Sequence, residues 1–221
     1  SGRADYGLLK PLITLIKEDK SLCLRLVVTG MHLGHAFGNT VKDIQNDGFA
    51  VSAEAEVLVN SDSPHDINKS ISIGVAAFSR ILVDLKPDVL VVLGDRYEIF
   101  SAVVASVALG IPVAHIHGGE ITLGAFDNFY RHAITKMSHI HFAAADEFEK
   151  RIIQMGESPN TVHMVGGLGA YQLRDFKPFS KDEIEKKLGL RFLKKNLLVT
   201  FHPVTLEPEE SVKHLTNLLS V

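Results

Sequence analysis

The sequence has no tryptophan and a single cysteine, Cys23, among its 221 residues. One cysteine excludes an internal disulfide framework and fits a reducing compartment. Lys and Arg number 23 against 26 Asp and Glu, so the chain lacks the basic excess that binds nucleic acid by neutralising phosphates. Because 46% of the residues are hydrophobic and the net charge is only −3, we expect a folded chain with a sizeable core.

Long apolar runs are also missing. No stretch approaches the ~18 uninterrupted apolar residues that a membrane-spanning helix requires. Residues 1–5 lack the charged and apolar regions of a secretory signal. We therefore expect a cytoplasmic protein whose partners include neither a membrane nor a nucleic acid.

What the sequence does contain is an alternation of short apolar segments with longer segments of helical periodicity. This alternation predicts an α/β fold, in which helices cover a Rossmann-like parallel sheet. The predicted strands are residues 22–29, 49–59, 89–93, 112–116, 139–143, 162–165 and 197–201. The predicted helices are residues 6–18, 66–85, 97–109, 128–137, 146–155, 181–188 and 207–219.

A polar stretch rich in Lys, Asp and Glu, residues 173–195, is the best candidate for a domain boundary. Residues 1–172 are then expected to form one Rossmann-like domain. The remaining residues, 196–221, hold one predicted strand and one helix, which is too little to bury a core. They are interpreted as the beginning of a second, incomplete domain.

Polar side chains follow several predicted strands at their carboxyl ends, where open α/β sheets bind ligands. His32, Asp95, Glu120 and His202 all take such positions. Asp95 has an alternative role as the N-cap of the next helix, and the sequence leaves both open. Glu120 follows two glycines, which favours a backbone shaped around a ligand.

Two further segments carry charged candidates. Asp127 and Arg131 lie four residues apart, so they are either a cap and a surface pair or part of a site. An Arg early in a helix opposes the helix dipole, and an anionic ligand would explain it. The predicted loop before residue 8 contains Arg3 and Gly7, and the helix that follows can bind a phosphate through its free N–H groups.

The histidines offer a weaker signal. His115 and His117 alternate along a predicted strand and could ligate a metal together with Glu120, but hydrogen-bonded strand histidines are the favoured interpretation. His139 and His141 have no carboxylate nearby in the sequence and are interpreted as structural. Cys23 is interpreted as a small core residue.

Three motifs are specific enough to indicate a family. Residues 94–98 (GDRYE), 114–120 (AHIHGGE) and 131–138 (RHAITKMS) resemble the hydrolysing UDP-N-acetylglucosamine 2-epimerases. Residues 2–7 and 29–33 look like the same family. The resemblance implies a glycosyltransferase-B architecture of two Rossmann-like domains, with the active site between them and no cofactor or metal.

The resemblance also implies an activity and roles for residues. These enzymes release UDP from UDP-N-acetylglucosamine by elimination to 2-acetamidoglucal, and hydration then yields N-acetylmannosamine. By motif, Asp95, Glu120 and Asp127 match catalytic carboxylates, and His32 and Arg131 join them at the sugar. Arg3, Gly7 and Arg96 are expected to bind UDP, with His202 reaching the phosphates from the second domain.

Several alternatives remain open. A non-hydrolysing epimerase would share the first step, and related enzymes act on UDP-diacetylbacillosamine or a GDP-sugar. A different class is a non-catalytic fragment that binds a nucleotide sugar. Relatives suggest a homodimer or a homotetramer.

Overall fold

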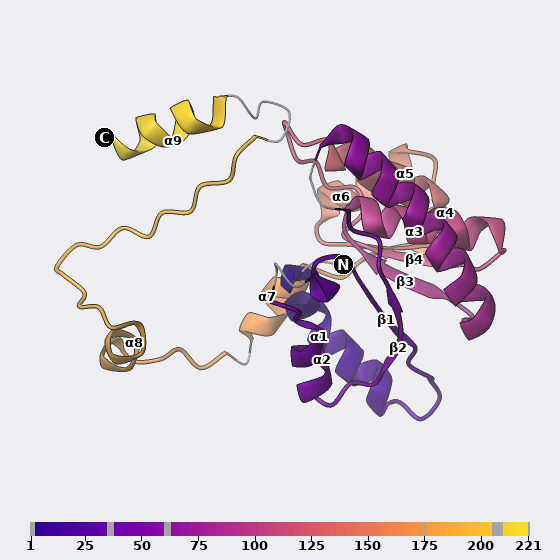
Figure 1. Ribbon diagram of the computed structural model, residues 1–221, viewed down its shortest axis with the longest axis horizontal. Helices are drawn as coiled ribbons and strands as arrows, with labels where there is room; N and C mark the ends of the chain where they lie inside the picture. Colours follow the sequence, from indigo (N-terminus) through magenta and orange to yellow (C-terminus); the bar gives the residue numbers. More distant parts are fainter. Residues whose placement is uncertain (1–2, 35–37, 60–62, 175, 205–209, 221) are drawn as a thin grey trace.

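The computed structural model describes residues 3–34, 38–59, 63–174, 176–204 and 210–220. Its body is a parallel α/β fold with helices packed around the strands, as the sequence predicts (Figure 1). The described strands form two parallel sheets, one of order β1-β2 and one of order β3-β4-β5-β6. The strands are β1 (Leu26–Thr29), β2 (Val51–Ala55), β3 (Leu90–Leu93), β4 (Val113–Ile116), β5 (Ile140–Ala143) and β6 (Val162–Met164).

The predicted helices are present, and the structure adds shorter ones. They are α1 (Arg3–Glu18), α2 (Val41–Asn46), α3 (Pro64–Leu85), α4 (Tyr97–Ala108), α5 (Asp127–Met137), α6 (Asp146–Gln154), α7 (Leu168–Leu173), α8 (Lys181–Leu188) and α9 (Ser211–Leu219). Helices α2 and α7 were not predicted, because six residues are too few to show helical periodicity. Helix α1 begins at Arg3, before the predicted start at residue 6, so the predicted loop that contains Arg3 is helical instead.

Helices α3 and α4 hold the two sheets together. The side chain of Ser63 caps α3 by accepting the Asp66 amide at 3.2 Å, with Pro64 in the first turn. A Cβ at Gly74 would lie 2.8 Å from the Ser101 side chain, so glycine permits the close approach of α3 to α4. Val27 of β1 and Leu90 of β3 pack against the same apolar cluster, which both helices line.

Two predictions about buried segments are wrong. Cys23 is exposed, since β1 starts only at Leu26. Residues 197–201 do not form a strand: Leu197 is 94% and Leu198 98% exposed. A strand needs a hydrogen-bonded neighbour, and none of the described strands lies beside this segment. Helix α9 agrees with the predicted 207–219 over its described part; residues 205–209 lie outside the described residues.

The chain after α7 leaves the body as an extended arm that carries α8 and α9 (Figure 1). Ser180 and Glu183 form a capping box at the start of α8, and Gly189 ends it in a left-handed conformation with φ 64°. The domain limits at residues 172 and 196 stay predictions. Of the helices described, none is long and apolar enough to cross a membrane.

Candidate active site

The site is built on the loops that follow β3 and β4. Asp95 comes directly after β3 and Gly94, whose φ of 80° turns the backbone sharply. The Gly94 carbonyl accepts a hydrogen bond from Nε2 of His115 at 2.8 Å. Arg96, not Asp95, occupies the N-cap position of α4. The Asp95 carboxylate is therefore not engaged as a helix cap.

Arg131 of α5 turns toward Asp95 rather than toward solvent. Its side chain is buried, and Nη2 donates to Oδ2 of Asp95 while Nη1 donates to Oγ1 of Thr122 at 3.2 Å. A simple surface pair with Asp127, one of the two sequence-based alternatives, is therefore wrong. Buried Nε of Arg131 has no hydrogen-bond partner among the described residues. An unpaired buried donor of this kind suits an anionic or carbonyl-bearing ligand.

Arg96 is engaged by an acidic residue, Glu98, that was not among the predicted site residues. Nε of Arg96 lies 3.1 Å from Oε2 of Glu98, and Nη2 lies 3.1 Å from Oε1. Glu98 is fully buried in the first turn of α4. The sequence does show a carboxylate in the first turn of an otherwise apolar helix, and this pattern could have indicated that Glu98 is buried and needs a charged partner. This fork fixes the Arg96 guanidinium beside Asp95 and Asp127.

Glu120 ends a tight loop that starts at His117. A Cβ at Gly118 would lie 2.9 Å from Nδ1 of His115, and one at Gly119 would lie 2.5 Å from the carbonyl oxygen of Phe148. Arg151 of α6 also donates to the Gly119 carbonyl. The two glycines therefore allow the loop to lie between β4 and α6. This packing sets the position of the Glu120 backbone.

The environment separates the pKa values of the three carboxylates. Burial raises the pKa of Asp95, with the Arg131 guanidinium offsetting part of the rise and Asp5 and Glu120 adding to it. Burial and the Asp95 carboxylate raise the pKa of Asp127. At Glu120, burial acts to raise the pKa, but the hydrogen bond from His117 and the charge of Arg131 outweigh it, so the pKa is lowered overall. Such a split suits acid–base chemistry, with one group ionised and others able to hold a proton.

The charge of Arg131 acts on all three carboxylates, Asp95, Glu120 and Asp127, and that of Arg96 acts on Asp95 and Asp127. His32 follows β1, where its Nδ1 lies 2.7 Å from Oγ1 of Thr40. It lines a separate hollow of about 520 Å³ together with Ala4, Tyr6, Thr40 and Asp43. The first turn of α1 links the two regions, because Ala4 and Tyr6 line this hollow while Asp5 acts on Asp95.

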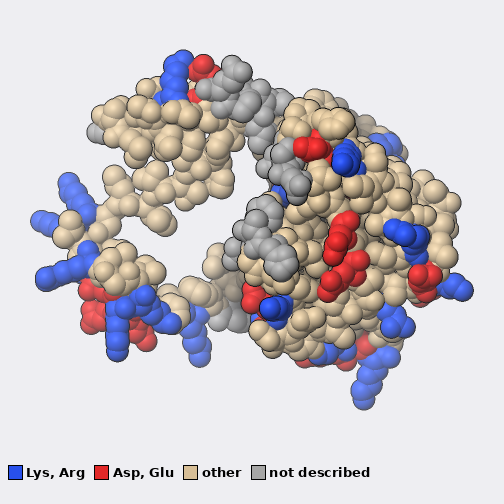
Figure 2. All heavy atoms as spheres, in the orientation of Figure 1, with Lys and Arg blue, Asp and Glu red and all other residues tan. Residues whose placement is uncertain are grey.

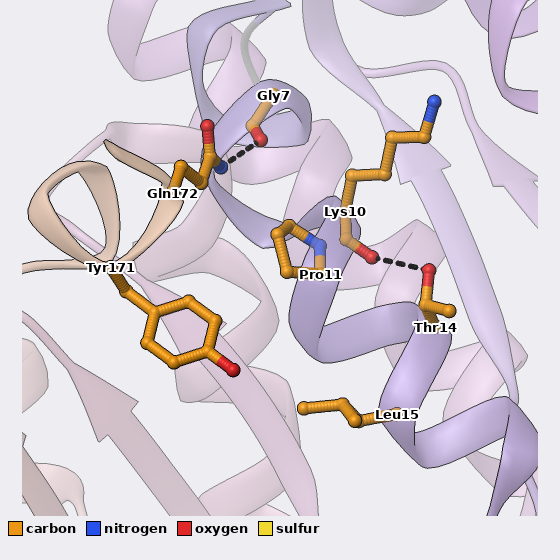
Figure 3. Close-up of a pocket in the computed structure, with 7 residues that line it drawn as sticks. All are labelled: Gly7, Lys10, Pro11, Thr14, Leu15, Tyr171 and Gln172. Carbon is orange, nitrogen blue, oxygen red and sulfur yellow. Dashed lines mark hydrogen bonds between the residues drawn. The ribbon is translucent and has the colours of Figure 1, made fainter. Parts of the chain in front are cut away.

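Gly7 lies beside another groove, of about 520 Å³, between α1 and α7 (Figure 3). Pro11 has no N–H to bond the Gly7 carbonyl within the helix, and the Gln172 side chain of α7 donates to that carbonyl instead (Figure 3). The groove contains no carboxylate from the cluster at β3 and β4. A role for Gly7 in binding UDP stays a prediction.

Two other predicted binding residues are not part of the described cluster. The side chain of Arg3 lies outside the described residues. His202 is exposed in the extended arm. Two residues later, Val204 lies against Gly124 of the loop after β4, since a Cβ at Gly124 would be 2.6 Å from its Cγ1. The arm therefore returns to the region where Asp127 begins α5.

The strand histidines have structural surroundings. His141 is buried, and its Nε2 lies 3.4 Å from Oε2 of Glu157, a carboxylate that is distant in the sequence but close in the fold. This contact could not be predicted, because the two residues are far apart in the sequence. Across the described residues, no three His, Cys, Asp or Glu side chains form a group that could hold a metal ion.

The buried His115 ring is expected to make the free energy of unfolding depend on pH. Burial lowers its pKa to about 4, against 6.5 for an ordinary histidine. Between these values the unfolded chain binds a proton that the folded chain does not, so the free energy of unfolding falls as the pH drops from 6.5 to 4. We expect this residue to contribute up to about 3 kcal/mol to that loss.

Urea denaturation at pH 7 and pH 4.5 measures the effect. His115→Gln keeps a donor for the Gly94 carbonyl and removes the titrating ring, so its stability should vary less with pH than that of the wild type. His65→Gln, at an exposed position on α3, is the matched control and should keep the wild-type dependence. An unchanged dependence in His115→Gln would contradict the prediction.

Figure 2 shows positive and negative side chains interspersed over the body. Helix α8 carries both signs, as its sequence KDEIEKKL requires. The described residues on the visible face therefore form no continuous basic surface.

Comparison with known proteins gives a consistent match. The family model described as UDP-N-acetylglucosamine 2-epimerase matches residues 14–221. The chain is 40% identical to polysialic acid biosynthesis protein P7 of Escherichia coli, over 99% of this chain and 56% of that protein. It is 38% identical to the hydrolysing GDP/UDP-N,N'-diacetylbacillosamine 2-epimerase of Campylobacter jejuni, over 98% of this chain and 56% of that protein. The chain thus spans about half the length of these relatives.

Solved structures share the fold. The UDP-GlcNAc 2-epimerase of Neisseria meningitidis, in a crystal structure with UDP-GlcNAc bound, superposes with a TM-score of 0.68 at 17% identity. The match covers 85% of this chain and 50% of that one. This parallel α/β arrangement agrees with the Rossmann-like part of a glycosyltransferase-B architecture.

Proposed function

The chain belongs to the UDP-N-acetylglucosamine 2-epimerase family, and we propose that it carries the catalytic carboxylates of a hydrolysing 2-epimerase. The reaction converts UDP-N-acetylglucosamine and water to N-acetylmannosamine and UDP. The observation that carries the proposal is the cluster of Asp95, Glu120 and Asp127 around Arg131, with one lowered and two raised carboxyl pKa values. A second domain would close over this cluster and contact the nucleotide.

The first step is an elimination, and Glu120 is assigned as its base. A lowered pKa keeps this carboxylate ionised near neutral pH, so it can accept the proton from C2 of the sugar. The C2–H electrons form the C1–C2 double bond, and the C1–O bond breaks with its electron pair leaving on UDP. Arg96 and Arg3 are assigned to the departing diphosphate, because a guanidinium binds phosphate through paired hydrogen bonds.

The second step is hydration of the 2-acetamidoglucal, and we assign it to Asp95 and Asp127. Their raised pKa values favour a shared proton, because two neighbouring carboxylates are not readily ionised together. One donates a proton to C2 on the face opposite Glu120, and the other takes a proton from the water that bonds to C1. Proton loss on one face and gain on the other inverts C2.

A second substrate is favoured by one comparison. The Campylobacter jejuni relative is named for GDP/UDP-N,N'-diacetylbacillosamine, which is also a nucleotide-linked 2-acetamido sugar. The carboxylate cluster addresses only C1 and C2, which the two substrates share. The proposal therefore commits to a nucleotide-linked 2-acetamido sugar, with UDP-N-acetylglucosamine as the first candidate. We further propose a homodimer or a homotetramer, by analogy with the family.

The test is incubation of the full-length protein with UDP-N-acetylglucosamine and with UDP-N,N'-diacetylbacillosamine, followed by identification of the products. The proposal predicts free UDP and a free 2-epimeric sugar from at least one of them. A UDP-linked epimer would indicate the non-hydrolysing reaction. Binding of nucleotide sugar without release of UDP would overturn the proposal in favour of a binding protein.

A further inference from the structure

His117 has an unusual backbone conformation at the end of β4. Its φ is 63°, in the left-handed region, and only Asn39 and Lys86 share a positive φ among the described residues other than glycine. Lys86 caps the end of α3, where such a conformation is common, and asparagine tolerates it well. A non-glycine residue in this conformation is strained, and the conformation persists only when the surroundings hold it there.

Both ring nitrogens of His117 are engaged by groups from different elements. The backbone N–H of Leu168, at the start of α7, donates to Nε2 at 3.4 Å. Nδ1 lies 3.1 Å from Oε1 of Glu120. Because Nε2 accepts the hydrogen bond from Leu168, the ring donates to the carboxylate through Nδ1.

The left-handed turn is what makes this contact possible. In a continuing strand, residues 115 and 117 would project to the same face of the sheet. The structure instead breaks the strand after Ile116, and His115 turns toward Gly94 while His117 turns toward Glu120. His115 therefore contacts the loop after β3, and His117 contacts the loop after β4.

Helix α7 is itself anchored. Gln172 donates to the carbonyl of Leu8 at 3.2 Å and also to that of Gly7, so α7 is fixed against α1. The His117 ring thus lies between Glu120 and a helix that is held on the body.

We propose that His117 is a positioning residue, which orients the Glu120 carboxylate and ties it to the start of α7. The role rests on the proposed function, since Glu120 is the base assigned to the C2 proton. His117 itself transfers no proton to the substrate. Its effect is to hold the Glu120 oxygen that does not bind Nδ1 in a reproducible direction.

Three substitutions separate the two contacts of the ring. Asparagine places its amide nitrogen at the same bond distance from Cβ as Nδ1, so His117→Asn keeps a donor for Glu120 and tolerates the left-handed backbone. Glutamine places its amide oxygen near Nε2, so His117→Gln keeps an acceptor for Leu168 and loses the contact with Glu120. His117→Gly removes both contacts and relieves the backbone strain.

The expected result is a loss of kcat of about 10–100-fold in His117→Gly and His117→Gln, with little change in KM, as for a misoriented catalytic group. His117→Asn should recover most of that loss. His163→Gln, at an exposed position on β6, is the control and should retain wild-type turnover. Equal kcat in the wild type, His117→Gly and His117→Gln would overturn the proposal.

A second readout needs no activity. The carboxyl pKa of Glu120, followed by carbon NMR, should rise in His117→Gly and His117→Gln and stay low in His117→Asn. Arg131 and His115 also act on this pKa, and both are unchanged in all three variants. If the wild type turns over no nucleotide sugar, the proposed function fails while this titration still tests the contact. An unchanged Glu120 pKa in all variants overturns the positioning role.

Discussion

Replacing Asp95 by Asn is expected to lower kcat by about 10²–10⁴-fold, the usual contribution of a general acid or base. The amide keeps the size of the side chain and a hydrogen-bond acceptor for Arg131, so the fold should be retained. Only the ability to hold and transfer a proton is removed. Because Asp95 is assigned to the hydration step, the variant should release UDP and accumulate 2-acetamidoglucal.

The complementary variant and a control separate the two steps. Glu120→Gln should fail to eliminate UDP but still hydrate 2-acetamidoglucal that is supplied directly. Asp88→Asn changes the same residue type at the exposed, opposite end of β3 and should have wild-type activity. If Asp95→Asn turns over at the wild-type rate without releasing the intermediate, Asp95 is not an acid–base group.

Gly119→Ala is expected to lower the free energy of unfolding by about 2–5 kcal/mol. The left-handed φ of 75° costs an alanine roughly 1–2 kcal/mol. The added Cβ would also lie 2.5 Å from the carbonyl oxygen of Phe148, a backbone atom of α6 that cannot move alone. Overpacking of this kind typically costs a further 1–3 kcal/mol.

Gly110→Ala is the matched control, measured by the same urea denaturation. Gly110 has a φ of 68°, but nothing lies within 4 Å of its Cβ position. It should therefore show the cost of the backbone conformation alone, about 1–2 kcal/mol. Equal destabilisation by the two substitutions would mean that the loop before Glu120 is not fixed against α6 by packing.

The positions of Asp95 and Glu120 at one edge of the sheet could be predicted from the sequence because they depend mainly on strand order. Asp95 and Glu120 follow strands that are both consecutive in the chain and neighbours in the sheet, and parallel strands end at the same edge. Arg131 was harder to place, since its partner depends on how α5 rotates about its own axis. Burial of one face of α5 against β4 and α4 turns it toward Asp95.

Contacts that join distant segments could not be predicted. The amide that binds His117 lies 51 residues away in α7, a helix too short to show periodicity. The left-handed conformation of His117 could not be predicted, because histidine adopts it more often than most residues but still only rarely, whereas glycine adopts it freely. Residues 197–201 have the composition of a buried strand, but a strand forms only when a neighbour supplies hydrogen bonds.

In the proposed reaction, C2 of the sugar loses a proton to Glu120 and regains one from the solvent on the opposite face. The most direct test is turnover of UDP-N-acetylglucosamine in deuterium oxide, with the free sugar analysed by NMR and mass spectrometry. We expect N-acetylmannosamine that carries one deuterium at C2, together with free UDP. Release of N-acetylglucosamine that retains its original hydrogen at C2 would contradict the account, because it would show simple hydrolysis without elimination.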